Sequence, residues 1–116
     1  MRLEELAEKI GASLLSPGPA AARCIERVYA GDRMSDLISH ASETTLVVTN
    51  LATSQLVRAA ALMDLSGLCL VNGVAPEPAL VAVAAANGTA LMVSPFDLFE
   101  TCGRLYECLR RQPQAV

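Results

Sequence analysis

The sequence has little positive charge and few aromatic side chains. Its 116 residues include 9 Lys and Arg against 12 Asp and Glu, and aromatic residues make up 3%. Nucleic-acid binding is not expected, because it needs clustered basic side chains and aromatic stacking surfaces. A Walker-type phosphate loop contains a Gly-Lys-Ser or Gly-Lys-Thr triplet, whereas the only lysine here is Lys9. Kinase or ATPase chemistry by that route is therefore excluded.

Metal-binding and membrane-spanning patterns are missing as well. Cys24, Cys69, Cys102 and Cys108 form no Cys-x-x-Cys pair, so neither a metal site, a cofactor nor a disulfide framework is expected. The longest apolar run, Ala79–Ala86, is too short to cross a bilayer, and the first residues are acidic rather than leader-like. We therefore expect a cytoplasmic protein with no membrane contact.

Hydrophobic residues are abundant. They make up 53% of the chain and charged residues only 18%, a more apolar balance than that of an ordinary domain. The length suits one domain with a sizeable core, residues 1–116. Because one core cannot readily cover so much apolar surface, the composition predicts a homodimer.

Short apolar runs predict the strands. Leu68–Val71 and Ala90–Val93 are bounded by Gly, Asn and Ser, which is typical of strands buried on both faces. Helix start and stop signals between them predict a helix over Glu77–Ala86. Further strands are expected at Ala12–Leu15, Cys24–Ala30 and Thr45–Val48, and further helices at Leu3–Ile10, at Ser35–Ala41, around Leu56–Met63 and after Ser94. This order predicts a three-layer α/β domain, with a mostly parallel or mixed sheet and helices on both faces.

The last helix has its own signals. Ser94 is expected to cap it, with Pro95 at the first position and Asp97 at the third. The predicted apolar face consists of Leu98, Phe99, Cys102, Leu105, Tyr106 and Leu109. Gly103 in the middle costs roughly 1 kcal/mol relative to Ala, which suggests that another backbone approaches closely there.

Polar residues follow the predicted strands. Ligands of open α/β sheets bind beyond the carboxyl ends of parallel strands, and the residues expected there are Asn50, Asn72, Gly73 and Ser94. Asp32 and Arg33 follow another strand, where Arg33 could contact an anion, or an acidic partner surface, with Asp32 orienting it. The alternative is local: such residues also end strands and cap helices.

No catalytic residue is assigned. His40 could act as a base oriented by Asp36, but no nucleophile can be tied to it. A surface ion pair between residues four apart is the simpler interpretation.

Four segments resemble a known family. They are residues 28–33 (VYAGDR), 46–50 (LVVTN), 67–73 (GLCLVNG, followed by Pro76 and Pro78) and 88–94 (GTALMVS). Together they resemble the DRTGG domain, which is similar to the N-terminal, non-catalytic domain of HPr kinase/phosphorylase. The motif maps onto Asp32, Arg33 and Gly73, while Val71 and Asn72 stand where the family has Thr and its first Gly.

The resemblance implies a regulatory or assembly module of α/β fold, usually attached to enzymes or to nucleotide-sensing domains and often dimeric. A partner enzyme or a small anionic ligand is the expected binding partner. Similar stand-alone members are associated with hydrogenase systems. The leading hypothesis is thus a non-enzymatic module that self-associates and binds a partner or ligand. The alternatives are a sensor of adenine nucleotides or other anions, and, more distantly, an enzyme of unknown chemistry.

Overall fold

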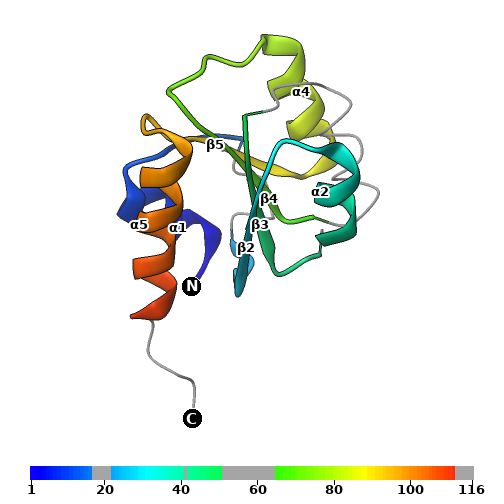
Figure 1. Ribbon diagram of the computed structural model, residues 1–116. Helices are drawn as coiled ribbons and strands as arrows, with labels where there is room; N and C mark the ends of the chain where they lie inside the picture. Colours follow the sequence, from blue (N-terminus) through cyan, green and yellow to red (C-terminus); the bar gives the residue numbers. More distant parts are fainter. Residues whose placement is uncertain (17–21, 41, 51–64, 112–116) are drawn as a thin grey trace.

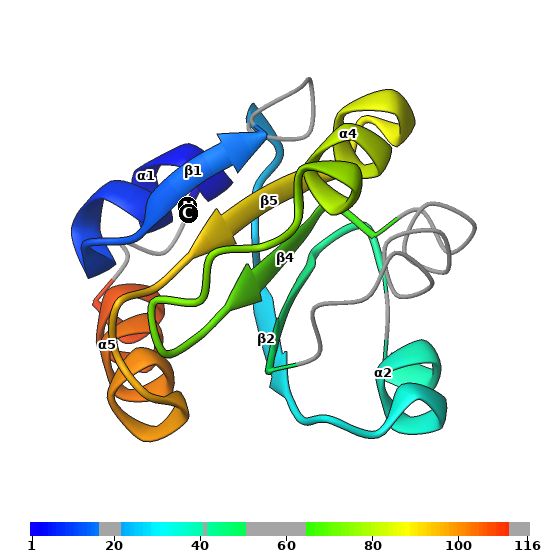
Figure 2. The same ribbon diagram turned by 90° about the horizontal axis from the view of Figure 1, so that it is seen from above.

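The computed structural model describes residues 1–16, 22–40, 42–50 and 65–111 (Figure 1). Its centre is a five-stranded sheet in the order β1-β5-β4-β3-β2. The strands are β1 (Ser13–Ser16), β2 (Arg27–Ala30), β3 (Thr45–Thr49), β4 (Gly67–Leu70) and β5 (Ala90–Val93). Strands β2 to β5 are parallel, and β1 runs antiparallel to β5 (Figure 2). The predicted mixed sheet is confirmed.

Helices cover both faces of the sheet. They are α1 (Leu3–Ile10), α2 (Met34–His40), α4 (Pro78–Asn87) and α5 (Leu98–Arg110). Helices α1 and α5 lie against each other on one face, while α2 and α4 lie on the other (Figures 1 and 2). This arrangement confirms the predicted three-layer α/β fold. The predicted helix around Leu56–Met63 lies outside the described residues.

The strand order follows from the connections. Each parallel strand pairs with the next one along the chain, so β2, β3, β4 and β5 stand side by side in sequence order. Right-handed crossovers that always advance in one direction place their helices on the same face. Helices α2 and α4 are such connections, which leaves the opposite face to the two terminal helices.

The apolar runs supply both cores. Val48, Cys69 and Met92 contact α1 and α5, whereas Val47 and Leu68 face the side covered by α4. Every residue of β3, β4 and β5 is buried. Strands covered on both faces need no polar alternation, which is why these runs are continuously apolar.

The segment before β2 differs from the prediction. Only Arg27–Ala30 is a strand, and Cys24 forms an isolated bridge with Arg2 instead. The reason is the partner: β3 begins at Thr45, which pairs with Arg27, and the Glu26 N–H still donates to the Thr44 carbonyl. One residue earlier the chain changes partner, because the Ile25 N–H donates to the Met1 carbonyl. Apart from the last helix, the other predicted boundaries within the described residues agree to within one or two residues.

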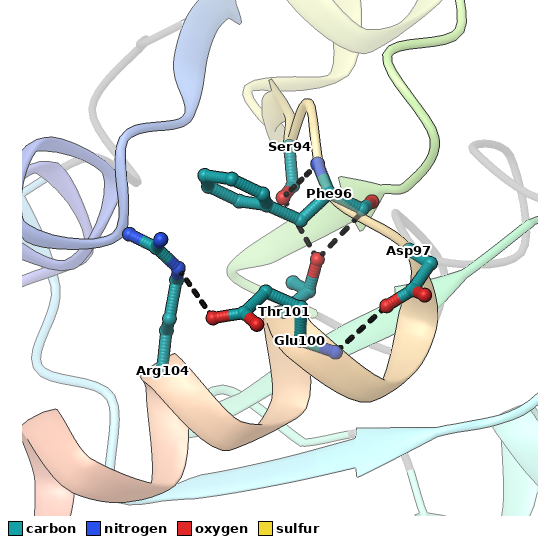
Figure 3. Close-up of polar contacts among 6 residues, drawn as sticks. All are labelled: Ser94, Phe96, Asp97, Glu100, Thr101 and Arg104. Atoms are coloured by element: carbon teal, nitrogen blue, oxygen red, sulfur yellow. Dashed lines mark hydrogen bonds and ion pairs between the residues drawn. The ribbon is translucent and has the colours of Figure 1, made fainter.

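The last helix begins later than predicted. Asp97 is its N-cap, and the side chain accepts a 2.8 Å hydrogen bond from the Glu100 N–H. The Ser94 hydroxyl pairs instead with that of Thr101 at 2.8 Å (Figure 3). Both residues are good caps, but Ser94 still belongs to the turn that leaves β5, so the cap at Ser94 was a wrong prediction.

The buried side of α5 also differs. Thr101 and Leu105 are buried, whereas Phe99 and Tyr106 are 88% and 65% exposed. The helix packs on α1 and on β2 and β3, and these contacts select only part of the predicted apolar face. Apart from the chain neighbours of Gly103 and the backbone of α5 itself, no described atom lies within 4 Å of the place where a Cβ would stand at Gly103, so the expected close approach does not occur within the described chain.

Candidate functional site

The predicted ligand residues lie at the carboxyl edge of the parallel strands. Two groups can be distinguished there. Asp32, Arg33 and Asn50 follow β2 and β3, and Asn72, Gly73 and Ser94 follow β4 and β5. Because β3 and β4 are neighbours, the two groups share one edge of the sheet.

Asp32 ties the ends of two strands together. Its Oδ1 accepts a 2.8 Å hydrogen bond from the Asn50 N–H and a 3.1 Å bond from the Thr49 hydroxyl. The Gly31 N–H donates to the Val48 carbonyl, 3.0 Å away, in the same region. The carboxylate of Asp32 therefore has a structural role: it links the turn after β2 to the end of β3.

Arg33 is an exposed cation among the described residues of this edge. Its side chain is 78% exposed, and its Nε lies 3.9 Å from Asp36 Oδ2. The described contacts thus pair Arg33 with Asp36 and not with Asp32, which binds β3. Such an exposed pair holds the guanidinium weakly, so an anion can compete for it.

The second group is locked by the backbone. Asn72 and Gly73 have φ values of 64° and 61°, the left-handed region that glycine and asparagine tolerate best. Their N–H groups donate to the carbonyls of Phe96 (2.7 Å) and Ser94 (2.8 Å). These bonds fix the turn after β4 onto the segment after β5. The two N–H groups are therefore engaged within the chain.

Ser94 lies inside the domain. It is fully buried, and its hydroxyl accepts a 3.2 Å bond from the Phe96 N–H in addition to its pair with Thr101. Figure 3 shows these contacts at the entrance to α5. The Ser94 hydroxyl is therefore not exposed to solvent, and its hydrogen bonds hold the segment that leads from β5 into α5.

A cavity of about 420 Å³ adjoins the second group. Gly73, Ala75 and Pro76 form one wall, and the other wall comes from Gly11, Ser13 and Leu15 beside β1. The residues near β1 were missed from the sequence. They reach the site only because Ser13 pairs with Val93, a contact that no local pattern indicates.

His40 has a different partner from the one predicted. Its ring stacks on Tyr29, with centroids 4.1 Å apart and planes 9° from parallel, while Asp36 contacts Arg33. Both rings line a cavity of about 250 Å³ beside the starts of β2 and β3, away from the carboxyl edge. Within the described contacts, no nucleophile is joined to His40.

The thiols of Cys69, which is buried, and Cys102, which is partly buried, both have raised pKa values. Burial raises the pKa of Cys69 to about 12; nearby Cys102 adds to the rise, and a hydrogen bond with the Ser94 backbone opposes it. Burial also raises the pKa of Cys102. Because the thiolate is the reactive form, neither residue is suited to nucleophilic or metal-binding work.

The described ranges, residues 1–16, 22–40, 42–50 and 65–111, lack two kinds of feature. No cluster of three or more His, Cys, Asp or Glu residues that could hold a metal ion occurs in them. Nor do they contain a helix with the length and apolar character needed to cross a membrane.

Comparisons with known proteins agree with the fold. The family model of the DRTGG domain matches residues 5–108. No curated protein matches the sequence. Among solved structures, the CBS and DRTGG domains of the regulatory region of Clostridium perfringens pyrophosphatase, complexed with the activator diadenosine tetraphosphate, are similar, with a TM-score of 0.69 and 14% identity. The likeness covers 90% of this chain and 45% of that chain, and at this identity it shows the fold alone.

Proposed function

The chain belongs to the DRTGG domain family, and from this premise we propose that it is a non-catalytic regulatory domain. It acts by binding a small anionic ligand and by self-association. The solved relative supports the regulatory role, since its DRTGG domain stands in the regulatory region of an enzyme. The chain spans less than half of that relative, so the role is a proposal for this protein.

The observation that carries the ligand site is the pairing of an open cation with a hollow at one edge of the sheet. Arg33 is exposed beyond β2, and the 420 Å³ cavity lies beyond β5. Three strand spacings separate β2 from β5, about 14 Å in all. A ligand that uses both must therefore be elongated, with an anionic group at one end and a less polar group at the other.

A nucleotide has this shape and chemistry. The solved relative is complexed with diadenosine tetraphosphate, which favours adenine-nucleotide sensing over the other anions considered from the sequence. The apolar walls around Val74, Pro76 and Val93 would accept a base, and Arg33 would pair with a phosphate.

Binding to a partner enzyme remains the other branch of this proposal. An association with hydrogenase proteins is supported only by the resemblance to stand-alone family members. The observation that supports self-association is the exposure of two large side chains of α5, Phe99 and Tyr106.

Thermal unfolding with added ligands tests the proposal. Diadenosine tetraphosphate, ATP, AMP and inorganic phosphate are compared, and a ligand at a hundredfold excess over its dissociation constant adds about 2.7 kcal/mol of stability. Arg33→Ala should abolish the shift without changing the melting temperature of the free protein. Arg111→Ala is the matched control, because Arg111 is equally exposed at 76% and also forms one surface ion pair, but lies at the far end of α5.

The outcomes separate the branches. If Arg33→Ala leaves the ligand-induced rise in melting temperature intact, the ligand does not bind at this edge of the sheet. No shift with any anion would leave only the partner-binding branch. ATP turnover that survives further purification would contradict a non-catalytic role.

A further inference from the structure

Helix α5 presents an aromatic stripe to solvent, defined here as Phe99, Gly103 and Tyr106. The two rings are 88% and 65% exposed, and Gly103 lies between them. At 100° per residue, the three positions lie within about 60° of one another around the helix axis. The opposite side of α5, around Leu105, packs on the domain. The stripe is therefore a continuous outer face and not a scatter of single exposed residues.

Gly103 has no role that the described chain explains. It lies in the middle of a 13-residue helix and forms no turn, and no described atom lies within 4 Å of a Cβ built there. A glycine at such a position weakens the helix relative to alanine. Its effect on the surface is to leave a notch between two large rings, through which another helix can approach closely.

The stripe is complementary to itself in one orientation. If two α5 helices cross antiparallel with a two-fold axis at Gly103, each glycine notch faces the other. Phe99 lies about 6 Å along the axis before Gly103, and Tyr106 about 4.5 Å after it. Phe99 of each copy then falls beside Tyr106 of the other, so the same patch serves both partners, as a two-fold interface requires. The rings come within the distance at which aromatic pairs attract.

We propose that this chain self-associates through an antiparallel pair of α5 helices that cross at Gly103. The proposal rests on the self-association included in the proposed function and names the surface that forms it. The occupant of the stripe is a second copy of this chain.

The charges beside the stripe permit this contact. Helix α5 carries two acidic and two basic residues, so it is neutral although the whole chain has a net charge of −3. Glu100 already binds Arg104 at 2.9 Å, and Glu107 binds Arg111 at 3.1 Å. Two copies can therefore meet without burying an unpaired charge. The antiparallel arrangement also places opposite ends of the helix dipoles together.

The size of the stripe sets the expected strength. Aromatic side chains bury about 150–250 Å² each when fully covered, so the two rings supply roughly 300 Å² per copy at their observed exposures. A standard interface buries about 800 Å² per partner. We therefore expect a reversible dimer that dissociates on dilution, not an obligate one.

Sedimentation equilibrium of the full chain at about 10–500 μM tests the proposal. Gly103→Leu fills the notch, and the structure offers open space for the new side chain in the monomer. It should weaken association at least tenfold while the monomer melts at the same or a higher temperature. Phe99→Ser, which removes one ring, should weaken association similarly. Ala85→Leu is the control, since it adds the same side chain to the exposed side of α4.

The possible results either support or overturn the pairing of α5 helices. A dimer that both α5 variants weaken and Ala85→Leu does not would support the pairing. A dimer that survives both variants would overturn it while leaving self-association intact through another surface. A wild-type protein that stays monomeric across the whole range would overturn both the α5 pairing and the self-association, but not ligand binding, which the thermal assay reports separately.

Discussion

Replacing Asp32 by alanine should destabilise the domain by about 1–2 kcal/mol. The substitution removes the acceptor of two hydrogen bonds, from the Asn50 N–H at 2.8 Å and from the Thr49 hydroxyl at 3.1 Å. Hydrogen bonds to a charged group are worth about 1.5–3 kcal/mol each. Asp32 is an exposed residue, however, and water can replace part of what is lost. We therefore expect a loss of only about 1–2 kcal/mol for the two bonds together, less than the sum of their separate values.

The assay is reversible thermal and urea unfolding of the protein without ligand. A loss of 1–2 kcal/mol corresponds to a fall of about 4–8 °C in melting temperature for a domain of this size. Asp32→Asn keeps an acceptor oxygen and should lose about half as much. Asp36→Ala is the matched control: it removes an exposed carboxylate of the same turn whose described partner is Arg33, 3.9 Å away. This variant should change stability by less than about 0.5 kcal/mol.

An unchanged melting temperature for Asp32→Ala would refute the structural role of the carboxylate. If that variant also lost the ligand-induced shift, the turn after β2 would be a binding element alone. A fall equal to that of Asp36→Ala would mean that general charge at the turn, and not the link to β3, is what matters.

Two further predictions concern groups elsewhere in the domain. Burial raises the pKa of Cys69 from its ordinary value of 9.0 to about 12 in the folded state, so the folded protein holds this proton more tightly than the unfolded chain does. The free energy of unfolding should keep its full value below pH 9 and should fall by about 1 kcal/mol between pH 9 and 10. The fall should be smaller in Cys69→Ala, where the raised pKa of Cys102 still contributes. An equal fall in both proteins, measured by urea unfolding at each pH, would contradict the buried thiol. Asp97→Ala removes the N-cap of α5 and should lower the free energy of unfolding by about 1 kcal/mol. Thermal unfolding measures this loss, with Ser94→Ala for comparison. If Ser94→Ala lost more helix content than Asp97→Ala, Ser94 would be the N-cap instead.

Local patterns were sufficient for most of the fold. Ala90–Val93 is a strand with the predicted bounds, and Pro78 and Gly88 mark the ends of α4 as expected. The short apolar runs of four or five residues are informative because a strand covered on both faces needs no polar alternation, whereas the longer run Ala79–Ala86 lies within helix α4. The DRTGG resemblance, which rests on residues at the ends of these runs, is confirmed by the family match.

Tertiary choices were not visible in the sequence. The periodicity of α5 puts Phe99, Leu105 and Tyr106 on one broad apolar arc, yet only the part around Leu105 meets the sheet. Which side of an arc is buried depends on where the partner elements stand. The same limit applies to Ser94 and Asp97, two competent caps between which the exit from β5 decides.

The position of the candidate residues in the fold could be predicted from the sequence, but their contacts could not. The carboxyl edge follows from parallel topology, so Asn50, Asn72 and Gly73 could be placed there in advance. Their roles as ligand residues stay predictions. The contribution of Gly11 and Ser13 to the cavity depends on β1, whose pairing with β5 spans most of the chain and leaves no local signal.

That long-range pairing also sets an order of events during synthesis. Ser13 pairs with Val93, which follows it by 93 − 13 = 80 residues. At about 5–20 residues per second, a ribosome needs roughly 4–16 s to cover that distance. Throughout this interval the apolar side of α1, with Leu3, Leu6 and Ile10, has neither the completed sheet nor α5 to cover it. Helix α1 is therefore synthesised first, but its apolar side is among the last surfaces to be buried. For several seconds this surface is open to binding by chaperones.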